Sequence, residues 1–429
     1  MVSPRIGKPE KNSLNEESQT MNTVLAGRFT PRALQGVPDV CTSGSPTCVL
    51  PHVGVPIRRG TYFLLAFFYI FSSAARAHSQ EPRDEVIIRG AEHTVAVENI
   101  CAWPGLVLMP DGIIAAAVFN KPSHGLEEGD VDCYVSADGG RTWEYAGTPA
   151  PHEQGKIRMN HAIGVGADSS LIVLCSGWDG EGYRKRILPV MVSRSRDRGR
   201  TWERNGSVQL NQDMPNLIPF GTIARLDRAT LAVSLYDAAT SGVFNRAYLF
   251  FSYDDGLTWK NPVIVGIKDV LFIPEAGNFN ETAVLCTGRN RLIAVSRTFI
   301  PAADLRFLVS ENRGRTWTIS ENSPDGAITR QYEHPGHLLK LRDGGILLTY
   351  GIRWGDHGIG ARISRDGGST WSAPLRVISY GGNDNGYPSS VQLDDGTVVT
   401  AFYSDTNRYH RGYYMGTVRW KIPSGLQSR

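Results

Sequence analysis

The pattern of apolar and polar positions along the 429-residue chain predicts many short strands and no long helix. Short apolar runs are separated by turn signals, above all by Asp-Gly pairs. At 338–350, for example, one apolar run is followed by Asp343-Gly344 and then by a second apolar run. Similar pairs of runs surround Asp111-Gly112 and Asp395-Gly396. Runs of this length joined by tight turns are typical of a meander of β-hairpins.

One octapeptide, Ser-x-Asp-x-Gly-x-Thr-Trp, recurs along the chain. Its tryptophans are 59, 57, 58 and 54 residues apart, and the fourth copy has Asn312 in place of Asp. A short Asp or Asn side chain can accept backbone N–H bonds inside a turn, Gly can adopt a left-handed conformation, and Trp can bury a large face. Each copy therefore indicates a hairpin corner anchored by an aromatic wedge. The copies cover residues 136–143, 195–202, 252–259, 310–317 and 364–371.

The period of the repeat predicts the fold. A unit of about 57 residues with about four strands is the size of a propeller blade. The stretch from about residue 84 to 423 accommodates about six such units. We therefore expect an all-β fold, a six-bladed β-propeller of four-stranded antiparallel blades. Five of its turns would be formed by the octapeptide, which is called the Asp box below (five Asp-box turns). The sixth blade is expected to join the two ends of the chain, which would remove exposed sheet edges.

The N-terminal 77 residues differ from the rest. Arg58-Arg59, an apolar run at 62–71 and Ala75-Arg76-Ala77 follow the layout of a secretory signal peptide. The run is too short for a membrane-spanning helix, which needs about 20 residues, although an uncleaved anchor is the alternative. We expect an N-terminal extension at 1–56 that is disordered or wrongly assigned, a signal peptide at 57–77 and a propeller at 78–429. The protein is then exported, to the periplasm or outside the cell.

The charge balance and the cysteines limit the classes of partner and cofactor that we expect. Residues 1–77 carry eight Lys/Arg and four Asp/Glu, which leaves 37 basic and 38 acidic residues in the remainder. Such a balance does not favour nucleic acid as a partner. The cysteines of this part, Cys101, Cys133, Cys175 and Cys286, match no zinc spacing, and Cys133 and Cys175 lie in apolar runs that favour buried thiols. We expect neither a metal nor a cofactor.

Repeated Asp boxes at this spacing resemble those of the sialidase superfamily, also called BNR-repeat proteins, over roughly 84–423. The resemblance implies boxes at the blade periphery and an active site elsewhere. Family sialidases clamp a sugar carboxylate with three arginines and use a Tyr nucleophile backed by a Glu, together with an Asp acid/base. A phenol suits this role because, unlike a carboxylate, it is neutral until a base takes its proton.

Several segments are similar to that scheme. Glu281 and Arg297 stand 16 residues apart on what we expect to be one hairpin, similar to the family's Glu and second arginine. Tyr387, in Gly-Tyr-Pro-Ser-Ser, resembles the nucleophile, and Arg353 matches the third arginine in position. Each of these residues also has a plainer interpretation, as a solvated or packing residue. Asp130 is the expected acid.

The remaining candidates are less tied to the resemblance. Glu127, Glu128 and His124 are alternatives to Asp130 in the loop 120–130. Arg158, His161 and His334 lie near expected strand starts, which can face the central channel. One expected element is absent, because Ala102 stands where the family has the first clamp arginine. A bidentate arginine–carboxylate pair is a strong orienting contact, so its loss argues for a different sugar.

These observations lead to a functional expectation. We expect a sialidase-like exo-glycoside hydrolase that acts on extracellular or periplasmic glycans with a non-classical sugar specificity, in which Arg297 and Arg353 could hold an acidic group such as a uronate or a sulfate. The alternative is a propeller that binds glycan or protein without catalysis. A polysaccharide lyase is the third interpretation. After signal cleavage no stable membrane insertion is expected, and the partner is a carbohydrate.

Overall fold

The computed structural model describes residues 85–86, 88–179, 186–238, 245–266, 279–298, 304–320, 327–407 and 411–426. The chain divides into two units, Met1–Ala75 and Arg76–Arg429, and every described residue belongs to the second. The extension predicted for 1–56 and the signal peptide predicted for 57–77 lie outside the described residues. Nowhere in the described ranges is there a helix with the length and hydropathy needed to cross a membrane.

The described residues form strands almost throughout, as the sequence predicts. They group into small, mainly antiparallel sheets in chain order, two of which are joined by parallel strand pairs into one closed sheet, and a short 3-10 helix, η2 (Ser424–Leu426), follows the last strand. The strands are β1 (Glu85–Val86), β2 (Glu92–Glu98), β3 (Cys101–Leu108), β4 (Ile114–Phe119), β5 (Val131–Ser136), β6 (Glu144–Ala150), β7 (Lys156–Val165), β8 (Leu171–Asp179), β9 (Met191–Ser195), β10 (Glu203–Val208), β11 (Ile218–Arg225), β12 (Leu231–Tyr236), β13 (Ala247–Ser252), β14 (Thr258–Val265), β15 (Phe279–Cys286), β16 (Leu292–Thr298), β17 (Leu305–Ser310), β18 (Thr318–Ile319), β19 (Glu333–Lys340), β20 (Ile346–Ile352), β21 (Gly358–Ser364), β22 (Leu375–Ser379), β23 (Asn385–Gln392), β24 (Val398–Thr406) and β25 (Arg411–Trp420).

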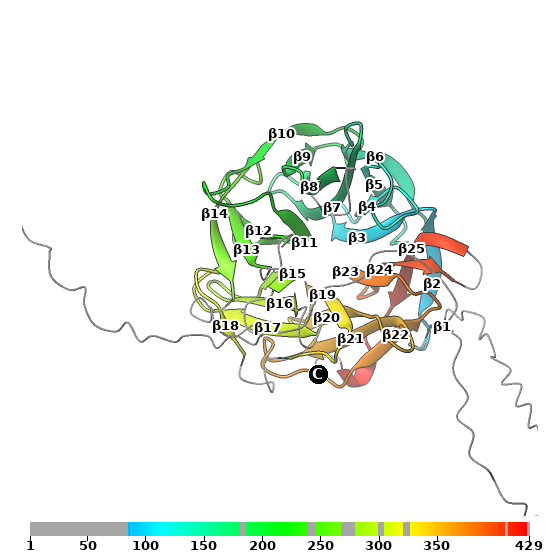
Figure 1. The fold of residues 1–429 in the computed structure, drawn as a ribbon. Coiled ribbons are helices and arrows are strands. Elements are labelled where there is room, and N and C mark those ends of the chain that lie inside the picture. Colours follow the sequence, from blue (N-terminus) through cyan, green and yellow to red (C-terminus); the bar gives the residue numbers. More distant parts are fainter. Residues whose placement is uncertain are drawn as a thin grey trace, which may run out of the picture. The chain divides into compact units, whose positions relative to one another are not determined.

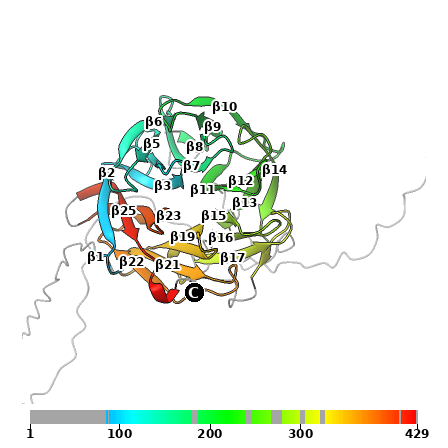
Figure 2. The same cartoon turned by 180° about the vertical axis from the view of Figure 1, so that it is seen from behind.

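The sheets follow one another around a centre. Figures 1 and 2 show β3, β7, β11, β15, β19 and β23 nearest that centre, with the later strands of each sheet further out. Each of these inner strands contacts the next, and β23 contacts β3. The expected all-β class and the propeller-like arrangement of small sheets are confirmed.

The two ends of the described chain meet in one sheet. β2 pairs antiparallel with β25, and Glu92 lies opposite Arg419 in the register. In Figure 1 the blue β2 therefore lies beside the red β25. β23 and β24 complete the sheet, so its last strand comes from the start of the chain. This is the closure that the repeat predicts, and it leaves β25 paired on both sides.

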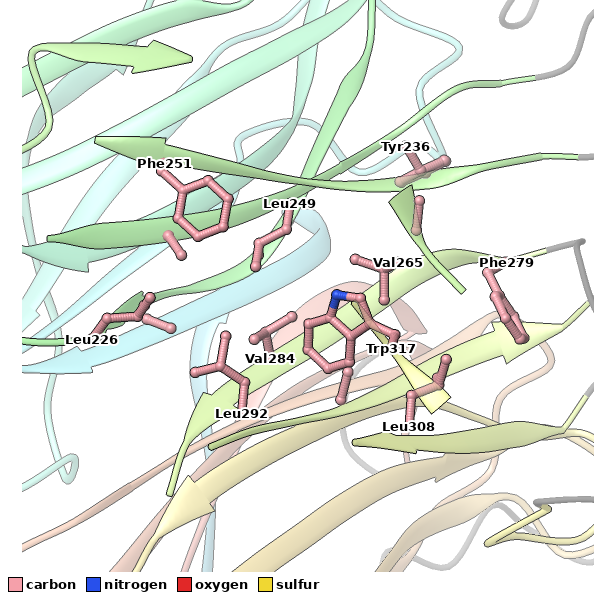
Figure 3. Packing of buried hydrophobic residues seen from close by; sticks show 14 of the residues in the cluster. Leu226, Tyr236, Leu249, Phe251, Val265, Phe279, Val284, Leu292, Leu308 and Trp317 are labelled. Atoms are coloured by element: carbon pink, nitrogen blue, oxygen red, sulfur yellow. The ribbon is translucent and has the colours of Figure 1, made fainter. Parts of the chain in front are cut away.

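The core lies between neighbouring sheets. In the cluster of Figure 3, Trp317 from one Asp box packs with Leu249 and Phe251 of β13 and with Leu292 and Leu308 of the next sheet. Trp317 is 4% exposed. Truncating an aromatic side chain at such a position typically costs about 3–5 kcal/mol. The Asp-box tryptophans therefore join sheets, as their size suggests.

The octapeptide loops are held by their own side chains. In the loop 252–259, Asp254 accepts hydrogen bonds from the hydroxyls of Ser252 and Thr258 at 2.8 and 2.5 Å, and the Thr258 amide donates to it at 2.9 Å. Trp259 Nε1 donates to the carbonyl of Gly256, whose φ of 92° is left-handed. The Thr amide bond to the Asp or Asn side chain and the Trp Nε1 bond to the Gly carbonyl recur in the loops at 136–143, 195–202, 310–317 and 364–371.

Candidate active site

Each of the inner strands carries an irregularity in its pairing register. A β-bulge adds a residue to one strand of a pair and redirects the side chains around it, often next to an active site. The register shifts lie between Cys101 and Gly105 in β3, Arg158 and His161 in β7, Phe220 and Ala224 in β11, Phe279 and Thr282 in β15, Glu333 and Gly336 in β19, and Gly386 and Ser389 in β23. The predicted Glu281, His334 and Tyr387 all fall inside these bulges.

Tyr387 and Glu281 form the centre of the site. The Tyr387 hydroxyl donates to Glu281 Oε1 at 2.5 Å, although the two residues are 106 positions apart in the chain. Arg297 Nη1 lies 2.8 Å from Glu281 Oε2 and 3.3 Å from the Tyr387 oxygen. Glu281 is 2% exposed and Tyr387 6%. The structure thus brings together the three residues for which the sequence predicts adjacent roles.

Electrostatics prepare this group for proton transfer. Burial, and then the charge of Glu281, raise the pKa of Tyr387 well above its usual value, so the phenol is neutral at rest. Arg297 is half-buried, and its desolvation disfavours its charge, but Glu281 and Tyr387 outweigh this effect and raise its pKa. A developing phenolate would therefore lie beside a fixed cation, with a carboxylate able to accept its proton.

The backbone of Tyr387 is itself unusual. Its φ is 52°, in the left-handed region that side chains other than those of Gly, Asn and Asp rarely adopt. Strain of this kind costs on the order of 1–3 kcal/mol and is concentrated at functional sites. The neighbouring Gly386 has a φ of 109°, and its Cα packs close to Gly351. The bulge thus fixes the direction of the Tyr387 side chain by an energetically costly conformation.

Arg353 forms the second ion pair of the site. Its guanidinium lies 5.5 Å from the centre of the Tyr387 ring, and Nη2 lies 3.5 Å from Asp384 Oδ1. Burial opposes its charge, but the Tyr403 and Tyr387 oxygens and Asp384 outweigh burial and raise the pKa of Arg353. Arg353 also donates to the Asn385 carbonyl. It is therefore held at the start of β23, just before the bulge.

Asp384 is the central acceptor of a further network. His124 Nδ1 lies 2.6 Å from Asp384 Oδ2, and the hydroxyls of Tyr403 and Tyr413 donate to Asp384 at 2.6 and 2.8 Å. Burial alone would raise the pKa of Asp384, but the hydrogen bond and charge of His124 and the two phenols lower it to about 2. Asp384 is thus a carboxylate at neutral pH and balances Arg353.

Aromatic rings surround the Tyr387 side chain. The Trp103 ring lies 4.8 Å from that of Tyr387, and the rings of Tyr403 and Phe220 lie 5.8 and 6.3 Å away. Trp103 also meets His124 edge-on at 5.5 Å. Trp103, Tyr387 and the predicted His161 line one small cavity of about 40 Å³ between the inner strands. Cavities of about 580 and 430 Å³ lie elsewhere and include none of the charged residues of the site.

The other predicted residues have different environments. His334 is buried, and burial followed by the charges of Arg297 and Arg353 lowers its pKa to about 2. Arg158 is held by Glu153 at 2.8 Å and by the Pro189 carbonyl. His334 therefore belongs to the site, whereas Arg158 forms a buried ion pair of its own.

Asp130, the expected acid, lies in a separate network. The hydrogen bonds that the structure gives it run to the side chain of Asn120 and to the amide and ring of His152, the last two at 2.6 Å. Its alternatives differ among themselves. Glu127 and Glu128 are exposed, whereas His124 belongs to the Asp384 network. The expectation that Asp130 is the acid stays a prediction.

Sequence reasoning did not identify Asp384, Trp103 and Tyr403 as site residues. For Asp384 a signal was present, because it stands three residues before Tyr387 in a segment rich in Gly, Asn and Asp. Trp103 directly follows Ala102, the position where the resemblance implies an arginine. Tyr403 gives no such signal, since it reads as one more apolar residue of a strand.

One group of described residues has the donor types of a metal site. Ligand atoms of Cys101, His124 and Asp384 lie within 4.8 Å of one another. Thiolate, imidazole and carboxylate are a suitable set for zinc. However, burial and then Asp384 raise the pKa of the Cys101 thiol well above its usual value, and both Asp384 oxygens already accept hydrogen bonds. Internal hydrogen bonding therefore accounts for this arrangement. The described cysteines are free, and Cys133 and Cys175 are buried as predicted.

Comparisons with known proteins agree with this architecture. The family model for the BNR repeat-like domain matches residues 112–400. No curated protein matches the chain. Among solved structures, a protein of unknown function from Dyadobacter fermentans is 22% identical with a TM-score of 0.65, and the match covers 78% of this chain and 100% of that one.

Two glycosidase structures share the fold at lower identity. A mutant of Trypanosoma rangeli sialidase displaying trans-sialidase activity is 14% identical with a TM-score of 0.56; the match covers 77% of this chain and 59% of that one. An α-L-arabinofuranosidase from Fusarium graminearum, in complex with an iminosugar inhibitor, is also 14% identical with a TM-score of 0.52, and the match covers 79% and 96% of the two chains. At such identities the likeness concerns the fold.

Proposed function

We propose that this chain, which belongs to the BNR repeat-like domain family, is an exo-acting glycoside hydrolase that uses Tyr387 as nucleophile and Glu281 as its base. The observation that carries the proposal is the 2.5 Å hydrogen bond between the Tyr387 phenol and Glu281 in a buried, ion-paired setting. A phenol needs a base to become a nucleophile, and here the base is in contact with it.

The proposed reaction has two steps. Glu281 takes the phenol proton as the Tyr387 oxygen attacks the anomeric carbon, the glycosidic bond breaks, and the leaving oxygen receives a proton from a general acid. Water then attacks the anomeric carbon of the aryl glycoside formed with Tyr387 in the first step, with the general acid now acting as base, and the proton on Glu281 returns to the phenolate. Asp130 is the predicted general acid, and Asp384 is the carboxylate nearest to Arg353 and Tyr403.

The finer architecture and the location belong to the same proposal. We take the sheets as six blades with Asp-box turns in five of them, and the boxes lie between the third and fourth strands, apart from the candidate site residues. The pattern at 57–77 supports export of the protein to the periplasm or beyond the cell. Its partner would be a glycan met in that compartment.

The second candidate is a binding propeller without catalysis. The feature that favours it is Ala102, which stands where the resemblance implies an arginine of the carboxylate clamp. A hydrolase, a lyase and a binder give different products. A free reducing sugar identifies a hydrolase, absorbance of an unsaturated uronate identifies a lyase, and binding with neither product identifies a binder.

The test is a release assay on residues 78–429 with aryl glycosides, sulfated polysaccharides and uronate-rich polysaccharides. We expect Tyr387→Phe and Glu281→Gln each to lower kcat by about 10²–10⁴-fold on the substrate that is cleaved. Tyr253→Phe and Glu311→Gln change the same residue types at exposed positions and are the matched controls. Full turnover in both site variants would exclude the nucleophile pair. Asp130→Asn and Asp384→Asn, compared on good and poor leaving groups, identify the general acid.

A further inference from the structure

The fixed charges around Tyr387 cancel within the protein. Arg297 is paired with Glu281 at 2.8 Å, and Arg353 lies 3.5 Å from Asp384. These side chains are largely buried, with exposed fractions of 16% and 2% for the first pair and 20% and 22% for the second. Neither cation is left in excess for an anionic ligand, so a bound carboxylate or sulfate would bring an unbalanced negative charge into the site.

The bulges of the inner strands also hold polar atoms that lack partners. Trp103 Nε1, Asn160 Oδ1, Asn280 Oδ1 and His334 Nδ1 are buried and have no hydrogen-bond partner. Their residues are 2–7% exposed, and each lies in the bulge of a different inner strand. An unpaired buried polar atom costs about 1–3 kcal/mol, so four of them in the bulges of four inner strands call for an explanation.

The chemistry of these atoms indicates what could pair with them. The indole N–H donates, the Asn oxygens accept, and the His334 ring is neutral at ordinary pH because burial and the neighbouring arginines lower its pKa to about 2. Hydroxyl groups both donate and accept, and a sugar carries several on one rigid ring. Trp103 and Phe220 supply apolar faces beside Tyr387, in keeping with ligand sites that combine aromatic walls with a few polar groups.

We propose that the site between the inner-strand bulges recognises a neutral glycosyl residue, one without a carboxylate or sulfate, through the unpartnered polar atoms of Trp103, Asn160, Asn280 and His334. This inference rests on the proposed function for the location of the sugar, and it departs from the expectation that Arg297 and Arg353 hold an acidic group. In this proposal the two arginines are neutralised by Glu281 and Asp384, and the hydroxyl groups of the sugar form hydrogen bonds with polar atoms in the four bulges.

Binding of matched sugar pairs tests the proposal. The ligands are methyl glucoside against methyl glucuronide and methyl galactoside against methyl galacturonide, with a methyl arabinofuranoside and a methyl sialoside added. Calorimetry on Tyr387→Phe of residues 78–429 avoids turnover and keeps every charge. We expect at least one neutral glycoside to bind with a Kd below about 10 mM, and about tenfold or more tighter than its uronide. A uronide or sialoside that binds as tightly, or a panel with no neutral binder, overturns the proposal.

Two further variants tie the result to the named residues. In the Tyr387→Phe background, Asp384→Asn leaves Arg353 without its carboxylate and should reduce the discrimination against the uronide. Asn160→Leu removes an unpartnered atom, so it should raise Tm while weakening neutral sugar binding about tenfold. Ser234→Ala is the control, because Ser234 Oγ is also buried and unpartnered but lies in β12, so Tm should rise with unchanged affinity. Unchanged affinity in Asn160→Leu overturns the role of the bulge.

The two proposals fail in different ways. If Tyr387→Phe binds neutral glycosides and the unchanged protein releases no sugar from any of them, the hydrolase proposal is wrong and the recognition proposal stands. If the unchanged protein cleaves the uronide or the sialoside in preference to neutral glycosides, the hydrolase proposal stands and the recognition proposal is wrong.

Discussion

At the scale of single residues, the site contains groups whose pKa values are shifted by burial so that their neutral forms are favoured. The charges of Arg297 and Arg353 affect the pKa of Tyr387 and the pKa of His334. Burial is the largest influence on both pKa values. In the unfolded chain each would return to its ordinary pKa. The protonation of these residues is therefore linked to folding, and a change of pH should affect the stability of the protein as well as its activity.

His334 makes this link measurable. Its pKa is lowered from 6.5 to about 2, so below pH 6.5 the unfolded chain binds a proton that the folded chain does not. The free energy of unfolding should thus fall as pH decreases from 6.5 towards 2, by about 1.4 kcal/mol per pH unit for this residue, and it should be unaffected above pH 6.5. His93 and His337, whose pKa values are lowered to about 4, add to the slope.

We expect His334→Gln to lose stability less steeply between pH 6 and 4. Urea unfolding at several pH values measures the slope, whatever the effect of the substitution at neutral pH. An unchanged slope would mean that His334 is protonated in the folded state.

At the scale of elements, the Asp box is a corner whose sequence and structure agree. The copy at 310–317 shows which property of the Asp side chain the turn requires. Asn312 replaces the usual Asp, yet Oδ1 still accepts from the Thr316 amide while Nδ2 donates to the Thr316 hydroxyl at 2.7 Å. The side-chain charge is therefore dispensable, whereas an acceptor at this position is retained.

This difference predicts a graded response in a neighbouring box. Asp254→Asn should change the free energy of unfolding little, because Asn312 already performs this role. Asp254→Ala removes the acceptor of the Thr258 amide and should destabilise the protein by about 1–2 kcal/mol, with unchanged kcat because the box holds no site residue. Chemical denaturation with both variants measures this, and equal losses in the two would assign the effect to charge.

The elements also show what a sequence can and cannot predict. The repeated box and the Asp-Gly turns act through local backbone bonds, so the strands and their order follow from the chain. Glu281, Arg297, Arg353 and Tyr387 were identified through the resemblance of their segments to those of family sialidases. The bulges were not, because each depends on pairing with a second strand, and they decide which side chains meet. The Asp384 network joins His124, 260 positions away, and Tyr413, 29 positions away, and no local pattern encodes it.

At the scale of the whole molecule, one sheet is shared between the two ends of the described chain. β2 pairs with residues 414–419 of β25 and covers that part of its edge. Met415, Val399 and Ile114 belong to one core cluster that Val97 of β2 joins, so the strand contributes apolar contacts as well as backbone bonds. Its removal would expose a paired edge and part of a core together.

A variant that begins at residue 100 tests this dependence. We expect it to unfold at a lower urea concentration than residues 78–429 and to associate at micromolar concentration through the exposed edge of β25. Equilibrium unfolding and size-exclusion chromatography measure the two effects. A variant that begins at residue 84 keeps β2 and is the control. Equal stability and a monomeric state in both would show that the closure contributes little.

The shared sheet also affects how the protein forms during synthesis. β2 leaves the ribosome more than 300 residues before β25, the strand that it pairs with. At about 5–20 residues per second, its edge waits for tens of seconds before a partner exists. The edge of β2 therefore has no partner strand in the growing chain until translation is nearly complete. The final closing step joins the most distant segments, and such non-local pairing is slow, so this interval is when the chain is most dependent on protection from aggregation.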